Sequence, residues 1–312
     1  MRAKGKDIVE IFGYRPDDIS PISLSFHENN KCPFVKEDCS KKNSDQTITY
    51  GVCSLTDGAK KEIGSEIIAC PKRLYADDFK VLKNASEEIW GKLPFIIGGS
   101  KEELRIKALQ FGESVIAFGQ GSGNEIGVSG DVRLSMDWVL QRYTYDGNKL
   151  IAQDFVGIEI QSIDITGNYR DCHNAYSKTR YQSDQEIKIP NSGHGLNWAN
   201  VHKRLMPQII RKGNIYKDIS RCKGFFFILP DSVFKRFESL LGHIDDIEHS
   251  ANDILTIHTY KLGKEVSYGN IRDIEIERKI SYTLLSVYEA FSQNSSERAS
   301  EVLDNNLKNY FD

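Results

Sequence analysis

Two carboxylates and one amide stand at positions where they could hold a divalent cation and act on a phosphate. Residues 155–161 alternate as a β-strand does, so Glu159 and Gln161 share one face and the apolar residues share the other. Asp137 lies about one strand and one turn upstream. Carboxylate oxygens suit a hard cation such as Mg²⁺, which stabilises charge on a scissile phosphate and lowers the pKa of bound water. The pattern predicts metal-dependent phosphodiester hydrolysis; the alternative is a half-exposed strand whose polar side meets water.

The third candidate residue of this site is Gln161, which stands where nucleases of this architecture usually carry a lysine. An amide can neither accept a proton as a general base nor carry positive charge, so we expect Gln161 to orient a water molecule or a phosphate oxygen. Glu125, which follows the glycine-rich stretch 119–123, is a further candidate ligand for metal or water, with a surface carboxylate as the alternative. A carboxylate pair could also hydrolyse sugars, but no aromatic platform accompanies this one.

Four of the six cysteines fall in the first quarter of the chain: Cys32, Cys39, Cys53 and Cys70. Four thiolates suffice for a closed tetrahedral site, for which zinc is the default and iron also suitable. The spacing lacks paired C-x2-C knuckles, so scattered buried cysteines are the alternative. Residues 1–80 are loop-rich and cannot bury much surface alone, so a metal would give them a reason to order.

Length and composition set broad limits. A chain of 312 residues suggests one large domain, or a main domain with a smaller attachment. We see no apolar run long enough to span a bilayer and no secretion signal, so we expect a cytoplasmic protein with no membrane partner. The net charge of −3 argues against a nonspecific nucleic-acid coat protein but allows a specific DNA enzyme.

Basic residues concentrate in one stretch, where they could contact phosphates. Only Asp218 opposes them, and a solvated surface is the alternative. The stretch contains Lys203, Arg204, Arg211, Lys212, Lys217, Arg221 and Lys223.

The predicted elements alternate between helices and strands. Asp146 and Gly147 predict a hairpin turn between strands at 138–145 and 150–165, which places Asp137 and Glu159 on adjacent strands. The other predicted elements are a helical stretch at 84–118 that restarts with a capping box at Ser100, a helix at 198–209 kinked by Pro207, a buried strand at 224–229, a strand at 254–260, and a helical C-terminus from about 273. This order predicts an α/β fold with a sheet flanked by helices.

Several motifs, in one order, resemble the NotI-like type II restriction endonucleases. The cysteine framework is similar to that of the family, as is Tyr-Arg-Pro-Asp-Asp-Ile-Ser at 14–20. Further similar blocks are Ser-Met-Asp-Trp-Val-Leu (135–140), Val-Gly-Ile-Glu-Ile-Gln (156–161), Thr-Gly-Asn-Tyr (166–169), Gly-Leu-Asn-Trp (195–198), Lys-Arg (203–204) and Pro-Gln (207–208).

The resemblance implies a fold and an activity. The fold is a PD-(D/E)xK nuclease core, a mixed β-sheet flanked by helices, at 81–312, with a small four-cysteine metal-binding segment at 1–80. The activity is Mg²⁺-dependent hydrolysis of double-stranded DNA by a homodimer at a GC-rich palindrome resembling CGGCCG or GCGGCCGC. A twofold-symmetric dimer reads a palindrome because each subunit sees the same half-site.

The resemblance also implies roles for individual residues. Asp137 and Glu159 become the Mg²⁺ carboxylates, Gln161 the family's glutamine, and Glu125 an additional acidic residue of the site. Lys203 and Arg204 become candidate DNA contacts. The four cysteines become ligands of structural iron, although spacing alone favours zinc. The remaining alternative is a non-catalytic DNA-binding or regulatory protein with the same four-cysteine site.

Overall fold

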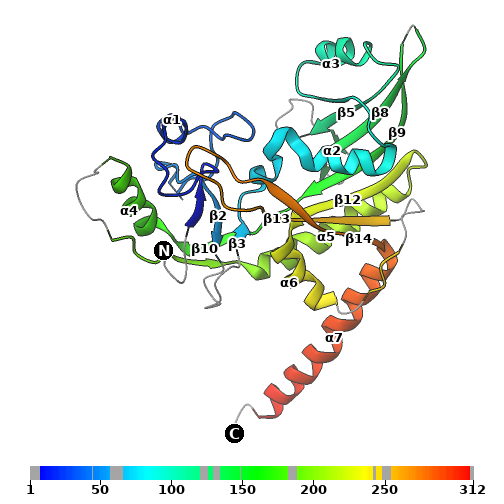
Figure 1. Cartoon of the computed structure of the whole chain (residues 1–312). Coiled ribbons are helices and arrows are strands. Elements are labelled where there is room, and N and C mark those ends of the chain that lie inside the picture. The colour runs from blue at the N-terminus through cyan, green and yellow to red at the C-terminus, as the bar shows by residue number, and fades with distance from the viewer. Residues whose placement is uncertain are drawn as a thin grey trace.

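The fold is built on one seven-stranded mixed sheet. The computed structural model describes residues 8–43, 45–56, 66–119, 126–128, 134–147, 149–181, 188–241, 244–247 and 254–309. The strand order across the sheet is β14-β13-β12-β9-β8-β5-β4 (Figure 1). The strands are β4 (Phe95–Ile97), β5 (Glu113–Gly119), β8 (Trp138–Tyr145), β9 (Leu150–Ile160), β12 (Cys222–Pro230), β13 (Ile254–Leu262) and β14 (Ile274–Thr283). The predicted mixed α/β architecture is confirmed.

The centre of the sheet matches the sequence prediction closely. Strands β8 and β9 form the expected antiparallel hairpin, and β12 runs parallel to both β9 and β13. Strand β12 is buried on both faces, because Phe226 and Ile228 pack on one side and Phe225 and Phe227 on the other. This explains why its sequence is continuously apolar rather than alternating.

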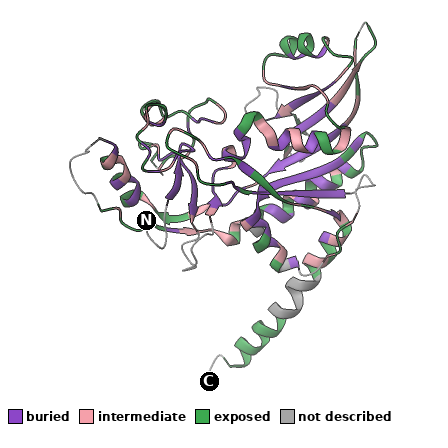
Figure 2. Ribbon diagram, in the orientation of Figure 1, coloured by how far each residue is buried: buried purple, intermediate pink, exposed green. Residues whose placement is uncertain are grey.

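Helices cover both faces of the sheet. Helix α2 (Ala76–Trp90) packs on one face, and α5 (Trp198–Lys217), α6 (Asp231–Leu241) and α7 (Leu284–Lys308) pack on the other. Figure 2 shows the buried residues concentrated in the sheet and its flanking helices, while the far end of α7 is exposed. Within the described residues, no helix is long and apolar enough to cross a membrane.

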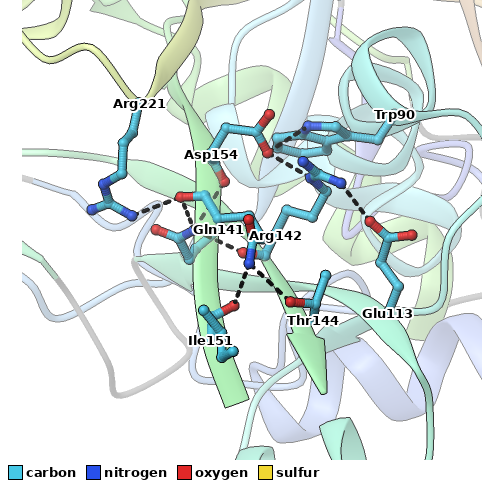
Figure 3. A network of polar contacts seen from close by, with 9 residues as sticks. Trp90, Glu113, Gln141, Arg142, Thr144, Ile151, Asp154 and Arg221 are labelled. Atoms are coloured by element: carbon cyan, nitrogen blue, oxygen red, sulfur yellow. Dashed lines mark hydrogen bonds and ion pairs between the residues drawn. The ribbon is translucent and has the colours of Figure 1, made fainter. Parts of the chain in front are cut away.

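A polar network fixes a bulge in the β8–β9 hairpin (Figure 3). The side-chain amide of Gln141 donates to three backbone carbonyls around the irregularity. Arg142 bridges the carboxylates of Glu113 and Asp154, each at 2.5 Å, and the indole of Trp90 donates to Asp154. These hydrogen bonds span the bulge, and the contact of Trp90 ties the hairpin to α2.

The N-terminal part forms a smaller unit beside the main sheet. Its elements are β1 (Ile8–Ile11), α1 (Pro21–Asn29), β2 (Val52–Thr56), β3 (Glu66–Ile68) and the 3₁₀ turn η1 (Pro71–Tyr75). Glu10 and Arg73 form a buried ion pair at 2.9 Å, and Arg73 also donates to the carbonyl of Arg272 at 2.5 Å. These contacts join the small sheet to the chain just before β14.

Two short strand pairs and two helices complete the described elements. Strand β10 (Ile165–Asn168) pairs with β11 (Gly193–Leu196), and β6 (Gly127–Val128) pairs with β7 (Leu134–Ser135). Helix α3 (Lys101–Ala108) covers the β4–β5 end of the sheet, and α4 (Arg170–Tyr181) follows β10.

Two predicted helical stretches are corrected by the structure. The capping box at Ser100 is present, but α3 ends at Ala108 and residues 113–119 form β5. Val115 and Ile116 are buried on opposite faces of the sheet. The sequence of this strand is therefore apolar at consecutive positions, and some of its apolar residues fall at helical spacing, which explains the wrong prediction. Similarly, residues 274–283 form edge strand β14 before α7 begins. The charged residues at its exposed positions resemble the sequence pattern of a solvent-exposed helix.

Helix α5 is longer than predicted. It runs through Pro207 to Lys217 rather than ending near residue 209. The sequence stripe had predicted its beginning correctly at Trp198.

Candidate active site

Asp137 and Glu159 lie against each other at the end of the β8–β9 hairpin. They are the next residues beyond the Trp138–Ile158 pair of the ladder. The backbone N–H of Asp137 donates to Glu159 Oε1 at 3.2 Å, and the N–H of Ile160 donates to Asp137 Oδ2 at 3.0 Å. Each carboxylate is thus oriented by the opposite strand, and the predicted adjacency is confirmed.

The face that carries Glu159 is covered rather than solvated. Val156, Ile158 and Ile160 pack towards α2, as the alternation predicts. Glu159 points the other way, beneath α5, where its side chain is only 1% exposed. The alternative interpretation of a strand with a wet polar side does not hold at this residue.

A lysine from α5 neutralises the buried carboxylate. Lys212 Nζ lies 2.5 Å from Glu159 Oε2, and the lysine side chain is 6% exposed. Burial and the adjacent Asp137 carboxylate nevertheless raise the pKa of Glu159 to about 8, with Lys212 acting in the opposite direction. Removing the pair from water is costly, and burial makes Glu159 hold a proton more tightly than an exposed glutamate does.

Gln161 follows β9 and lies at the mouth of the site. Its backbone N–H donates to the carbonyl of Ile228, and its side-chain amide donates to the carbonyl of Ser162 at 3.0 Å. It lines a cleft together with Asp137. Glu125, the fourth candidate, lies outside the described residues.

The cleft has a volume of 580 Å³ and runs between the sheet edge and the N-terminal unit. Asp137, Gln161 and Asp164 lie on the core side, and Arg204 and Gln208 reach it from α5. The opposite wall consists of residues from the N-terminal unit: Glu37, Ser40, Lys41, Pro71 and Lys72. Basic side chains and carboxylates therefore both line the cleft, and Lys72 and Arg204 pair there with Glu37 and Asp164. Cations on both walls could contact a phosphate backbone.

The basic stretch 203–223 does not form one surface. Arg204 pairs with Asp164 at 2.9 Å on the cleft wall, and Lys212 is buried against Glu159. Arg221 donates to the carbonyl of Gln153 at 2.6 Å. Lys203 is exposed. The sequence identified the stretch but missed the distinct role of Lys212, although a signal existed: this lysine falls on the apolar stripe of α5 between Ile209 and Tyr216.

The four cysteines gather in the N-terminal unit and are all buried and free. Burial, followed by the influence of Cys70, raises the pKa of the Cys53 thiol, and burial raises the pKa of Cys39 to about 11. Cys32 contributes to both shifts, so the thiols are electrostatic neighbours. However, no three or more His, Cys, Asp or Glu side chains in the described ranges are placed to hold a metal ion. The expected four-cysteine metal site is therefore not seen as a formed site.

Comparison with known families defines the class of the protein. The family model described as restriction endonuclease NotI matches residues 22–267, which include the cysteines, both carboxylates, Gln161 and helix α5. The chain belongs to the NotI restriction endonuclease family, and it is accordingly a site-specific deoxyribonuclease that acts on double-stranded DNA. A search among curated proteins gave no match.

Proposed function

We propose that this protein is a Mg²⁺-dependent type II restriction endonuclease with a PD-(D/E)xK core, in which Asp137 and Glu159 hold the metal. The observation that carries the proposal is their reciprocal hydrogen bonding from adjacent antiparallel strands, beside a cleft that has basic side chains on both walls. The order of β8, β9, α5 and β12 supports the same assignment, because the two carboxylates come from the hairpin and the covering helix follows it.

The residues present fit a hard divalent cation, because both candidate ligands are carboxylates and they lie side by side at the same end of the β8–β9 hairpin. Bound Mg²⁺ would supply charge stabilisation at the scissile phosphate and a more acidic water. Gln161, at the mouth of the cleft, orients a water or a phosphate oxygen. Glu125 is proposed as an additional ligand of metal or water.

Basic residues on both walls of the cleft would hold the DNA backbone. Arg204 lies on the α5 side, and Lys41 and Lys72 lie on the N-terminal side. Lys203 is exposed one residue before Arg204 and extends this surface. We propose that a homodimer binds a GC-rich palindrome similar to CGGCCG or GCGGCCGC, since two identical subunits read two identical half-sites.

The four cysteines are proposed to bind a structural metal, iron by family resemblance and zinc as the alternative. All four are free, buried thiols of the N-terminal unit, which supports this proposal, and four thiols are the right donor set. Residues 1–80 would then be the metal-binding segment and residues 81–312 the endonuclease domain, with α2 running through the boundary.

Asp137→Ala and Glu159→Ala test the proposed centre. Each removes one metal carboxylate, so we expect the cleavage rate to fall roughly 1,000-fold, the equivalent of several kcal/mol of lost charge stabilisation. Cleavage of unmethylated plasmid DNA in Mg²⁺ measures the effect, and binding of the same DNA in Ca²⁺ should be retained.

Glu102→Ala is a matched control, because Glu102 is an exposed carboxylate on α3. It should cleave as the unaltered protein does. Full cleavage by both Asp137→Ala and Glu159→Ala would refute the assignment.

A further inference from the structure

Helix α5 carries one buried cation directly above the candidate metal ligands. Lys212 is buried, whereas its neighbours Arg211 and Lys217 on the same helix are exposed. Its ammonium lies 2.5 Å from Glu159 Oε2. The other oxygen of this carboxylate, Oε1, accepts the N–H of Asp137. Lys212 and the hairpin backbone together therefore fix both oxygens of Glu159.

Close packing between α5 and β9 makes this contact possible. Gly157 lies two residues before Glu159 on the same strand face, and Tyr216 lies one turn after Lys212 on the same helix face. A Cβ at Gly157 would stand 2.1 Å from Cζ of Tyr216, so only glycine lets the helix approach this closely. The Gly157–Tyr216 contact thus sets the register that places Lys212 over Glu159.

The location of Lys212 is costly for stability. Removing an ammonium and a carboxylate from water carries a penalty that an apolar pair of similar volume would avoid. Nucleases of this architecture usually carry a lysine two residues after the strand glutamate, and here that position is Gln161, which has no charge. The strand therefore carries no lysine beside its glutamate, whereas α5 brings one against Oε2 of the same glutamate.

We propose that Lys212 supplies from α5 the lysine ammonium that the strand lacks at position 161, acting as a positioning residue that fixes Glu159 for metal binding. The inference rests on the proposed function. Lys212 touches Glu159 rather than facing the cleft, so it acts through this carboxylate. The two charged groups lie 2.5 Å apart, a distance at which a partly buried ion pair interacts strongly.

Relocating the lysine tests the proposal. Lys212→Met should slow single-turnover cleavage in Mg²⁺ by about 10- to 100-fold, the scale for loss of a residue that orients a metal ligand. DNA binding in Ca²⁺ should be unchanged. Lys212→Arg, which retains the charge, should recover much of the rate. Adding Gln161→Lys to Lys212→Met should also recover at least about tenfold, because it returns an ammonium to the same strand face.

Lys235→Met is the matched control, because Lys235 also pairs with a carboxylate from a helix, Asp231, but on α6. It should cleave normally. The proposal is overturned if Lys212→Met cleaves at the unaltered rate, or if neither Lys212→Arg nor the relocated lysine improves a slow Lys212→Met. If Lys212→Met does not fold, the relocated double variant decides: folding with cleavage supports the proposal, and failure to fold overturns it.

A metal-free measurement separates this idea from general damage. If Lys212 acts through Glu159, then Glu159→Gln should lower the melting temperature less in the Lys212→Met background than alone, since the pair is already broken. Additive shifts would overturn the proposal. Full cleavage by both Asp137→Ala and Glu159→Ala would instead refute the proposed function, whereas inactive forms of these two variants with an active Lys212→Met refute only this inference.

Discussion

At the scale of single residues, Glu159 is the most constrained group of the site. Its carboxylate is buried, accepts a backbone N–H and contacts Lys212, while Asp137 adds a second negative charge nearby. Because burial and Asp137 both disfavour the charged form, Glu159 holds a proton more tightly than an exposed glutamate does. A divalent cation bound at the proposed site would reverse this balance, so metal binding would be coupled to proton release.

This coupling predicts a pH dependence for the metal-free protein. The pKa of Glu159 rises from 4.5 to about 8 on folding, so between these values the folded protein binds more protons than the unfolded chain. Stability should therefore fall as pH rises from 4.5 to about 8, and the affinity for Mg²⁺ should rise over the same range. Denaturant unfolding and calorimetric titration measure the two quantities.

Glu159→Gln provides the control for this prediction, because the amide does not titrate. It should lose the part of the pH slope that belongs to Glu159. An identical slope in the variant would show that another group is responsible.

Strand alternation was enough to predict which residues of β9 share the face of the site. It could not predict that this face is buried, because burial depends on α5, some fifty residues later in the chain. The ion pair between Lys212 and Glu159 is a tertiary contact of the same kind. Its one local signal is a lysine within an apolar helical stripe.

At the scale of elements, the approach of α5 to β9 determines the geometry of the site. Gly157→Ala would place a Cβ into the ring of Tyr216. We expect a loss of about 1–3 kcal/mol in the free energy of unfolding, the usual cost of overpacking. Cleavage should fall as well, because the displaced helix carries Lys212 and Arg204. Denaturant unfolding and single-turnover cleavage measure these effects.

Gly112→Ala is the matched control. A Cβ there meets no heavy atom within 4 Å. Its stability should change by no more than about 0.5 kcal/mol, as for ordinary surface substitutions. Equal losses in both variants would contradict the proposed importance of the Gly157–Tyr216 contact.

Elements with strong local signals were predicted well, and those with weak ones were not. Asp146 and Gly147 predict the β8–β9 turn, and the apolar run in β12 predicts a central strand. Strand β5 was mistaken for helix because both its faces are buried. Strand β14 is an edge strand whose exposed charged residues carry no distinct β pattern.

At the scale of the whole molecule, the cleft arises between parts that are far apart in the sequence. Lys41 and Lys72 come from the N-terminal unit, while Arg204 comes from α5. Neither periodicity nor motif spacing relates these positions, so this wall of the site could not be predicted from sequence. The N-terminal unit is therefore a boundary of the candidate active site as well as the location of the cysteines.

The proposed structural metal predicts a loss of stability when it is removed. The purified protein should contain iron, with thiolate-to-iron absorption, or zinc. Cys39→Ser and Cys70→Ser should abolish metal content and lower the free energy of unfolding by several kcal/mol, since metal binding contributes directly to folding. Elemental analysis and denaturant unfolding provide the measurements.

Cys222→Ala is the control for metal content, because Cys222 is buried in β12 outside this group. It should retain the metal. A metal-free protein of unaltered stability, isolated from cells supplied with iron and zinc, would refute the structural metal.

The most direct test of the central claim is to sequence both strands at the ends of plasmid fragments produced by the protein in Mg²⁺. The proposed homodimeric endonuclease predicts identical, symmetrically placed ends within one GC-rich palindrome, and no cleavage when Mg²⁺ is chelated. Specific binding without strand scission, or ends scattered without a common sequence, would contradict the account.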